Sequence, residues 1–141
     1  GLAAGIARVL KAADPAIQVI GVSMAVAPAM HASIEAGKPV EVEEKDSLAD
    51  ALLGGIGLDN AYTFPMVDNY LDRIDLVSEK EIEAGMVYAH DQLGIIVEGA
   101  AAVTLSWLLA HKSPGKNTVG ILSGGNVERK MLFEILARHK K

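Results

Sequence analysis

The sequence predicts an α/β protein with a largely parallel sheet, because helical patterns alternate with short apolar runs along the chain. Residues 2–10 carry apolar side chains at helical spacing, and Pro15 lies just past that pattern. The run 17–22 is β-branched and apolar on both faces, which is typical of a buried parallel strand. We expect further strands at 74–76 and 118–122.

Capping signals place helices between these strands. Ser78 and Glu81 form a capping box, in which each side chain satisfies a free backbone donor at a helix start. Gly37 is suited to end the helix that precedes it, since glycine is the usual residue just past a helix end. We expect helices at residues 28–36, 63–71, 78–93, 99–110 and 127–136. We also expect helical turns at 47–53, a glycine-rich loop at 54–57 and a turn at 113–115.

Composition and charge narrow the class of protein. Of the 141 residues, 50% are hydrophobic and 22% are charged, which is the balance of a globular domain. The net charge of −5 argues against nucleic acid and anionic membrane partners, because both favour basic patches. The absence of cysteine excludes disulfides and thiolate metal sites. The apolar stretch 95–110 is shorter than the ~20 residues of a membrane helix. We expect a cytoplasmic protein.

Two features suggest that the chain is a fragment. It begins at Gly1 without a methionine or a leader. In addition, a sheet of so few strands would leave an edge exposed unless another segment covers it. We therefore expect residues 1–141 to belong to a larger protein.

The sharpest candidate site is the run Ser123-Gly124-Gly125-Asn126, which lies between a predicted strand and a predicted helix. In parallel α/β folds, ligands bind at the carboxyl ends of strands. The two glycines let the backbone approach a ligand closely, and the Ser123 hydroxyl offers one donor and two acceptor sites. The local pattern fits an ordinary tight turn equally well.

Glu98 is the second candidate. It is a lone carboxylate between an apolar run and a run of alanines. Burial of an unpaired charge is costly, so Glu98 needs a partner or access to a cleft. From the local pattern alone, a structural interaction at a helix start is the favoured alternative. The loop at 54–57 matches no phosphate-binding fingerprint, and the histidines show no metal-ligand spacing.

Five segments in order resemble the threonine dehydratase and serine racemase family of pyridoxal-phosphate (PLP) dependent enzymes. Residues 1–7 resemble the end of the phosphate-binding loop and the helix after it, and 20–22 resemble the strand that follows. Residues 47–51 resemble a Thr-Ile-Ala-Asp-Gly segment, and 97–101 are similar to Glu-Pro-Ser-Gly-Ala. Residues 122–127 match the Leu-Ser-Gly-Gly-Asn signature.

The resemblance implies a fold and a cofactor site. Residues 1–141 would be the C-terminal part of a PLP-dependent catalytic domain with the three-layer, parallel-sheet fold of the tryptophan synthase β type. Ser123 would hydrogen-bond the pyridine nitrogen of PLP without holding it protonated, which suits elimination. Gly1 would end the phosphate cradle at a helix N-terminus. The residues implied at the cofactor are Ser123, Gly124, Gly1, Glu98, Ala51 and Gly54.

The implied reaction removes the β-hydroxyl of threonine or serine and gives a 2-keto acid and ammonia. The segment 50–60 particularly resembles the dehydratases of hydroxyectoine utilisation, so a related hydroxy amino acid is an alternative substrate. A non-catalytic ligand-binding domain of the same fold is a further alternative. We expect a homodimer, or self-association of the fragment, and no nucleic acid or membrane partner.

The chain departs from the family pattern in three respects. The lysine that carries the cofactor belongs to an N-terminal segment outside these residues, so we expect no catalytic residue here and no activity from residues 1–141 alone. Some relatives hold a divalent cation through two acidic residues. Ser23 and Ala29 stand at those positions, so we expect no metal site. Ala51 replaces a glycine that usually abuts the cofactor, which affects the choice of substrate.

Overall fold

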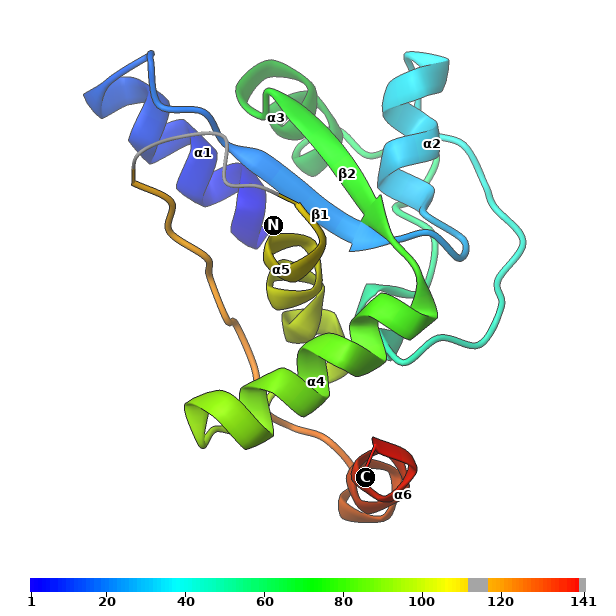
Figure 1. The fold of residues 1–141 in the computed structure, drawn as a ribbon. Helices are drawn as coiled ribbons and strands as arrows, with labels where there is room; N and C mark the ends of the chain where they lie inside the picture. The colour runs from blue at the N-terminus through cyan, green and yellow to red at the C-terminus, as the bar shows by residue number, and fades with distance from the viewer. Residues whose placement is uncertain (112–116, 140–141) are drawn as a thin grey trace.

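Helices and short strands alternate in the computed structural model, which describes residues 1–111 and 117–139 (Figure 1). The elements in chain order are α1 (Leu2–Ala13), β1 (Ile20–Met24), α2 (Ala29–Ala36), the short 3₁₀ helix η1 (Asp50–Leu52), α3 (Thr63–Tyr70), β2 (Arg73–Val77), α4 (Glu79–Leu93), α5 (Gly99–Ala110) and α6 (Arg129–His139). The predicted α/β class is confirmed. The turn predicted at 113–115 lies outside the described residues.

The sheet of the described residues consists of β1 and β2, which are parallel. Their register runs from Ile20 opposite Arg73 to Met24 opposite Val77. Helices α2 and α3 form the crossover between the two strands, as a parallel pair requires. A long loop leaves α2 and returns to η1 beside the start of α4 (Figure 1).

The strand predicted at 118–122 is wrong, because this segment has no regular secondary structure. A strand needs a neighbouring strand to pair its backbone groups, and the sheet of the described residues contains only β1 and β2. The segment lies along α5 instead. A Cβ added at Gly120 would be 2.9 Å from Thr104 Cγ2 and 3.0 Å from Leu108 Cδ1.

The core lies where α5 packs against α4 and the sheet. Helix α5 is apolar nearly all round, which is typical of an enclosed helix, and most of its residues are buried. Gly85 in α4 lets the two helices approach closely, since an added Cβ would lie 2.5 Å from Ser106 Oγ and 2.9 Å from the Ala102 carbonyl oxygen. Ile82 and Met86 complete the α4 side of this core.

Local signals at the helix ends are confirmed. The Ser78 side chain accepts a hydrogen bond from the Glu81 amide, and the Glu81 carboxylate accepts from the Ser78 amide and hydroxyl. Those hydrogen bonds hold the pKa of Glu81 below its usual value. Gly37 ends α2 at φ 67°, and Gly54 and Gly57 take positive φ values of 96° and 81° in the glycine-rich loop.

Asp72 fastens α1 to the start of the sheet. Its carboxylate accepts hydrogen bonds from Lys11 Nζ at 2.8 Å and from the Val19 amide at 2.6 Å. These two donors, Lys11 first, lower the pKa of Asp72. Within the described residues, no helix is long and apolar enough to cross a membrane.

Candidate functional site

The two candidates of the sequence, Glu98 and the run 123–126, lie in contact. The Glu98 amide donates a hydrogen bond of 3.2 Å to the Gly124 carbonyl oxygen. The Glu98 carboxylate accepts one of 3.0 Å from the Asn126 amide. Although Glu98 is the N-cap residue of α5, its side chain makes no capping hydrogen bond. The carboxylate therefore holds the turn before α6 and does not cap its own helix. The structural interaction at a helix start, which the local sequence pattern favoured, is wrong.

Both glycines of this turn approach the segment 96–98 closely, Gly124 at the Glu98 side chain and Gly125 at the Ile96 backbone. A Cβ added at Gly124 would lie 2.5 Å from Glu98 Oε1, and one added at Gly125 would lie 2.7 Å from the Ile96 carbonyl oxygen. Real Cβ atoms essentially never come so close to another heavy atom. The turn is thus packed directly on the residues that begin α5, which fixes where Ser123 stands.

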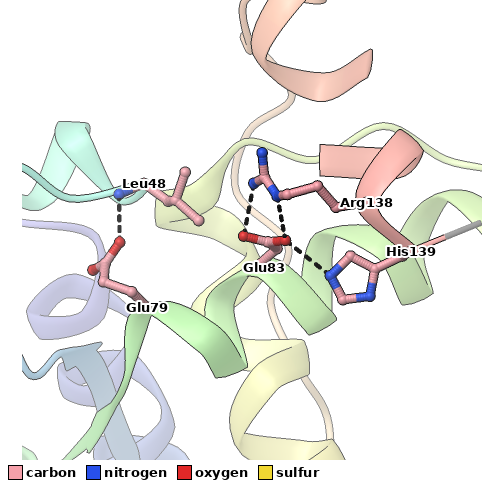
Figure 2. A network of polar contacts seen from close by, with 5 residues as sticks. All are labelled: Leu48, Glu79, Glu83, Arg138 and His139. Atoms are coloured by element: carbon pink, nitrogen blue, oxygen red, sulfur yellow. Dashed lines mark hydrogen bonds and ion pairs between the residues drawn. The ribbon is translucent and has the colours of Figure 1, made fainter. Parts of the chain in front are cut away.

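The segment 47–51 meets the same place from the other side. A Cβ added at Gly99 would overlap the Leu48 carbonyl group, so the backbone of this segment lies directly on the start of α5. The amide of Leu48 donates to the Glu79 carboxylate at the start of α4 (Figure 2). The hydroxyl of Ser47 donates to the same carboxylate. Three segments that are distant in sequence therefore converge at Glu98 and Gly99.

The remaining predicted site residues are placed less closely. Ala51 is exposed within η1, and Gly54 is half-buried in the loop that follows. Gly1 is exposed, and an added Cβ there would meet nothing within 4 Å. The structure thus joins Glu98, Gly124 and the segment before Ala51, and it leaves Gly1 open at the start of α1.

Ser123 presents a free hydroxyl beside this junction. The residue is exposed, and its side chain makes no hydrogen bond to any part of the chain in 1–111 or 117–139. A hydroxyl can donate to or accept from a ring nitrogen without carrying charge. A neutral hydroxyl next to two glycines, whose backbone carries no side chain, fits the cofactor PLP. Across the described ranges, no three His, Asp or Glu side chains are grouped to hold a metal ion.

Residues 1–124 match the family described as pyridoxal-phosphate dependent enzyme. The chain belongs to this family. It is 47% identical over 138 residues to the putative threonine dehydratase of Sinorhizobium fredii, covering 96% of this chain and 42% of that protein. It is 37% identical over 141 residues to the L-threonine ammonia-lyase of Geobacter sulfurreducens, covering 98% of this chain and 34% of that protein.

Solved structures of this PLP-dependent family share the fold. The processed form of threonine deaminase isoform 2 from Solanum lycopersicum superposes with a TM-score of 0.84 at 27% identity, over 99% of this chain and 41% of that one. Maize serine racemase gives a TM-score of 0.77 at 25% identity, over 96% and 43% of the two chains. The chain therefore spans well under half the length of these relatives, and its fold is part of theirs.

Two acidic residues on α4 were missed by sequence reasoning. Glu79 holds the segment 47–51, and Glu83 accepts hydrogen bonds from Arg138 and His139 at the end of α6 (Figure 2). The Arg138 guanidinium holds the pKa of Glu83 below its usual value. The i,i+4 spacing of the two carboxylates on one helix face was visible in the sequence, but their partners were not.

Proposed function

We propose that the full-length protein containing this chain is a PLP-dependent ammonia-lyase that eliminates the β-hydroxyl of threonine or serine, with release of a 2-keto acid and ammonia. The observation that carries the proposal is the free Ser123 hydroxyl beside the contact between Glu98 and Gly124. It stands in a chain whose relatives include proteins named threonine dehydratase and L-threonine ammonia-lyase.

The proposed roles follow from the contacts. Bound PLP supplies an electron sink for negative charge at the substrate α-carbon. Ser123 binds the ring nitrogen through a neutral hydroxyl, which adds no charge to the ring and so favours loss of a β-substituent. Glu98 holds the turn that carries Ser123 by accepting the Asn126 amide. Because Gly124 has no side chain, its backbone lies close to the Glu98 carboxylate.

The test is a substrate panel with the purified full-length protein and PLP. Release of 2-keto acid and ammonia is followed with L-threonine and L-serine, with D-threonine as the stereochemical control. Turnover of one L-hydroxy amino acid supports the proposal. PLP binding without turnover of any member of the panel would favour a ligand-binding domain instead.

A second candidate substrate rests on the segment 50–60, which resembles the dehydratases of hydroxyectoine utilisation. We propose that Ala51 and Gly54, which lie in this segment, take part in selecting the substrate side chain. A hydroxyectoine-derived hydroxy amino acid therefore belongs in the panel. A kcat/KM higher for it than for L-threonine would assign the protein to that substrate.

We further propose that the protein works in the cytoplasm as a homodimer. Large apolar side chains are exposed on α1 and on the segment before Ser123, among them Leu2 at 59%, Val9 at 67% and Val119 at 83% of full exposure. Such surface favours packing against another part of the full-length protein or against a second copy of it. Sedimentation of the full-length protein at several concentrations distinguishes a stable dimer from a monomer.

A further inference from the structure

Glu79 uses both oxygens of its carboxylate on one short segment. Oε1 accepts a hydrogen bond of 2.6 Å from the Ser47 hydroxyl. Oε2 accepts one of 2.7 Å from the Leu48 amide (Figure 2). The Ser47 oxygen in turn accepts the Ala49 amide at 3.0 Å. These groups are partly buried, and 31 or 32 residues of sequence separate Glu79 from its partners. Charge-assisted hydrogen bonds of this kind are stronger than neutral ones.

The segment that Glu79 holds lies against the start of α5, next to Glu98 of the candidate site. The Leu48 carbonyl lies against Gly99, the residue after Glu98, so tightly that no Cβ fits between them. The turn of η1 follows directly, with Leu52 donating to the Ala49 carbonyl. A shift of this segment would therefore move Ala51 and press on the start of α5, where Glu98 holds the turn that carries Ser123.

We infer that Glu79 is a positioning residue for the cofactor site, acting through the backbone of residues 47–51. The inference rests on the proposed function, because it assigns Glu79 a part in PLP binding. Glu79 makes its side-chain hydrogen bonds to Ser47 and Leu48 and not to Ser123 or Glu98, so we expect its effect to be exerted on geometry. Loss of its carboxylate releases the segment and weakens the binding of PLP, while the rest of the core keeps its packing.

The same helix offers a matched control. Glu83 lies one turn after Glu79 and also uses its carboxylate on distant partners, but those partners are Arg138 and His139 on α6. Glu83→Ala removes an acidic side chain of the same kind from the same helix without touching the segment 47–51. Glu79→Gln is the conservative variant, since its amide can still accept from Leu48 and donate to the Ser47 oxygen.

The experiment measures PLP affinity of the full-length protein by titration of bound-cofactor absorbance, together with hydrogen exchange of the peptide 47–53. Glu79→Ala is expected to weaken PLP binding about tenfold, to shift the absorbance maximum of the bound cofactor and to raise exchange in that peptide. Glu79→Gln is expected to stay within about threefold of wild type, and Glu83→Ala within about twofold. Should Glu79→Ala not fold, Ser47→Ala is expected to weaken PLP binding about threefold.

The outcomes separate the inference from the proposed function. If the wild-type protein binds no PLP, the proposed function fails and the role of Glu79 fails with it. If wild type binds PLP and Glu79→Ala binds it as tightly, with an unchanged spectrum, the inference alone is overturned. An equal loss of affinity in Glu79→Ala and Glu83→Ala would also overturn it, because the effect would then belong to the helix and not to the segment.

Discussion

The Glu98 carboxylate accepts a hydrogen bond of 3.0 Å from the Asn126 amide, which lies 28 residues further along the chain. The Glu98 amide donates to the Gly124 carbonyl in the same contact. Together these hydrogen bonds tie the start of α5 to the turn that precedes α6. The position of Ser123 depends on this tie, because Ser123 is the residue before Gly124.

Gly124→Ala is expected to disrupt this tie. The new Cβ would lie 2.5 Å from Glu98 Oε1, so the carboxylate or the turn must move, at a cost of about 1–3 kcal/mol in the free energy of unfolding. Urea unfolding of the variant measures that loss. The control is Gly5→Ala in α1, where an added Cβ meets nothing within 4 Å and helix propensity favours alanine by about 0.5–1 kcal/mol. Equal stability of the two variants would contradict the close approach.

Asp75→Ala is expected to destabilise the packing of α5 on β2. The Trp107 indole donates to Asp75 Oδ2 at 2.8 Å, and Trp107 is 6% exposed. An indole N–H left without its acceptor costs about 1–3 kcal/mol. Chemical unfolding followed by fluorescence reports this directly, since Trp107 is the sole tryptophan. Arg73→Ala removes an exposed ion pair to the same carboxylate and is expected to cost less than about 1 kcal/mol. A larger loss of stability in Arg73→Ala than in Asp75→Ala would contradict the role assigned to the hydrogen bond between Trp107 and Asp75.

Acid is expected to loosen the docking of α6 on α4. The pKa of Glu83 is lowered in the folded protein, mainly by Arg138, so its contribution is present above the unfolded value of about 4.3 and is lost as the pH falls through the folded value. Glu83→Gln should therefore lower Tm by about 1–3 °C at pH 7. At a pH below the folded pKa the difference should vanish.

The matched measurement uses Glu41→Gln, at an exposed position. Its Tm should follow that of wild type at every pH. A Tm difference between Glu83→Gln and wild type that persists unchanged into acid would show that the carboxylate charge is not what holds α6.

Local signals predicted much of the fold. The capping box at Ser78 and the C-cap at Gly37 could be predicted because each involves groups within a few residues of one another. The sequence could not show that 118–122 forms no strand, because strand pairing depends on a neighbouring strand and not on the segment itself. Its β-branched pattern is real, but its contacts in the described chain are with α5.

The site was predicted in part, for the same physical reason. The sequence showed that Glu98 needs a partner, since a buried charge must be compensated, but it could not show that the partner is the Asn126 amide. Glu79 gave no signal as a site residue, because Ser47 and Leu48 lie 32 and 31 residues before it. Contacts that close such long loops are a property of the fold.

The measurement that tests the central claim most directly compares Ser123→Ala with wild type in the full-length protein, each saturated with PLP and L-threonine. Loss of one hydrogen bond to the cofactor, worth about 1 kcal/mol or somewhat more, is expected to leave PLP bound and to lower kcat for 2-keto acid release about five- to tenfold. Ser123→Asp, which places a charge at the ring nitrogen, is expected to change the distribution of products. Unchanged turnover and unchanged products in both variants would contradict the assignment of Ser123 to the cofactor.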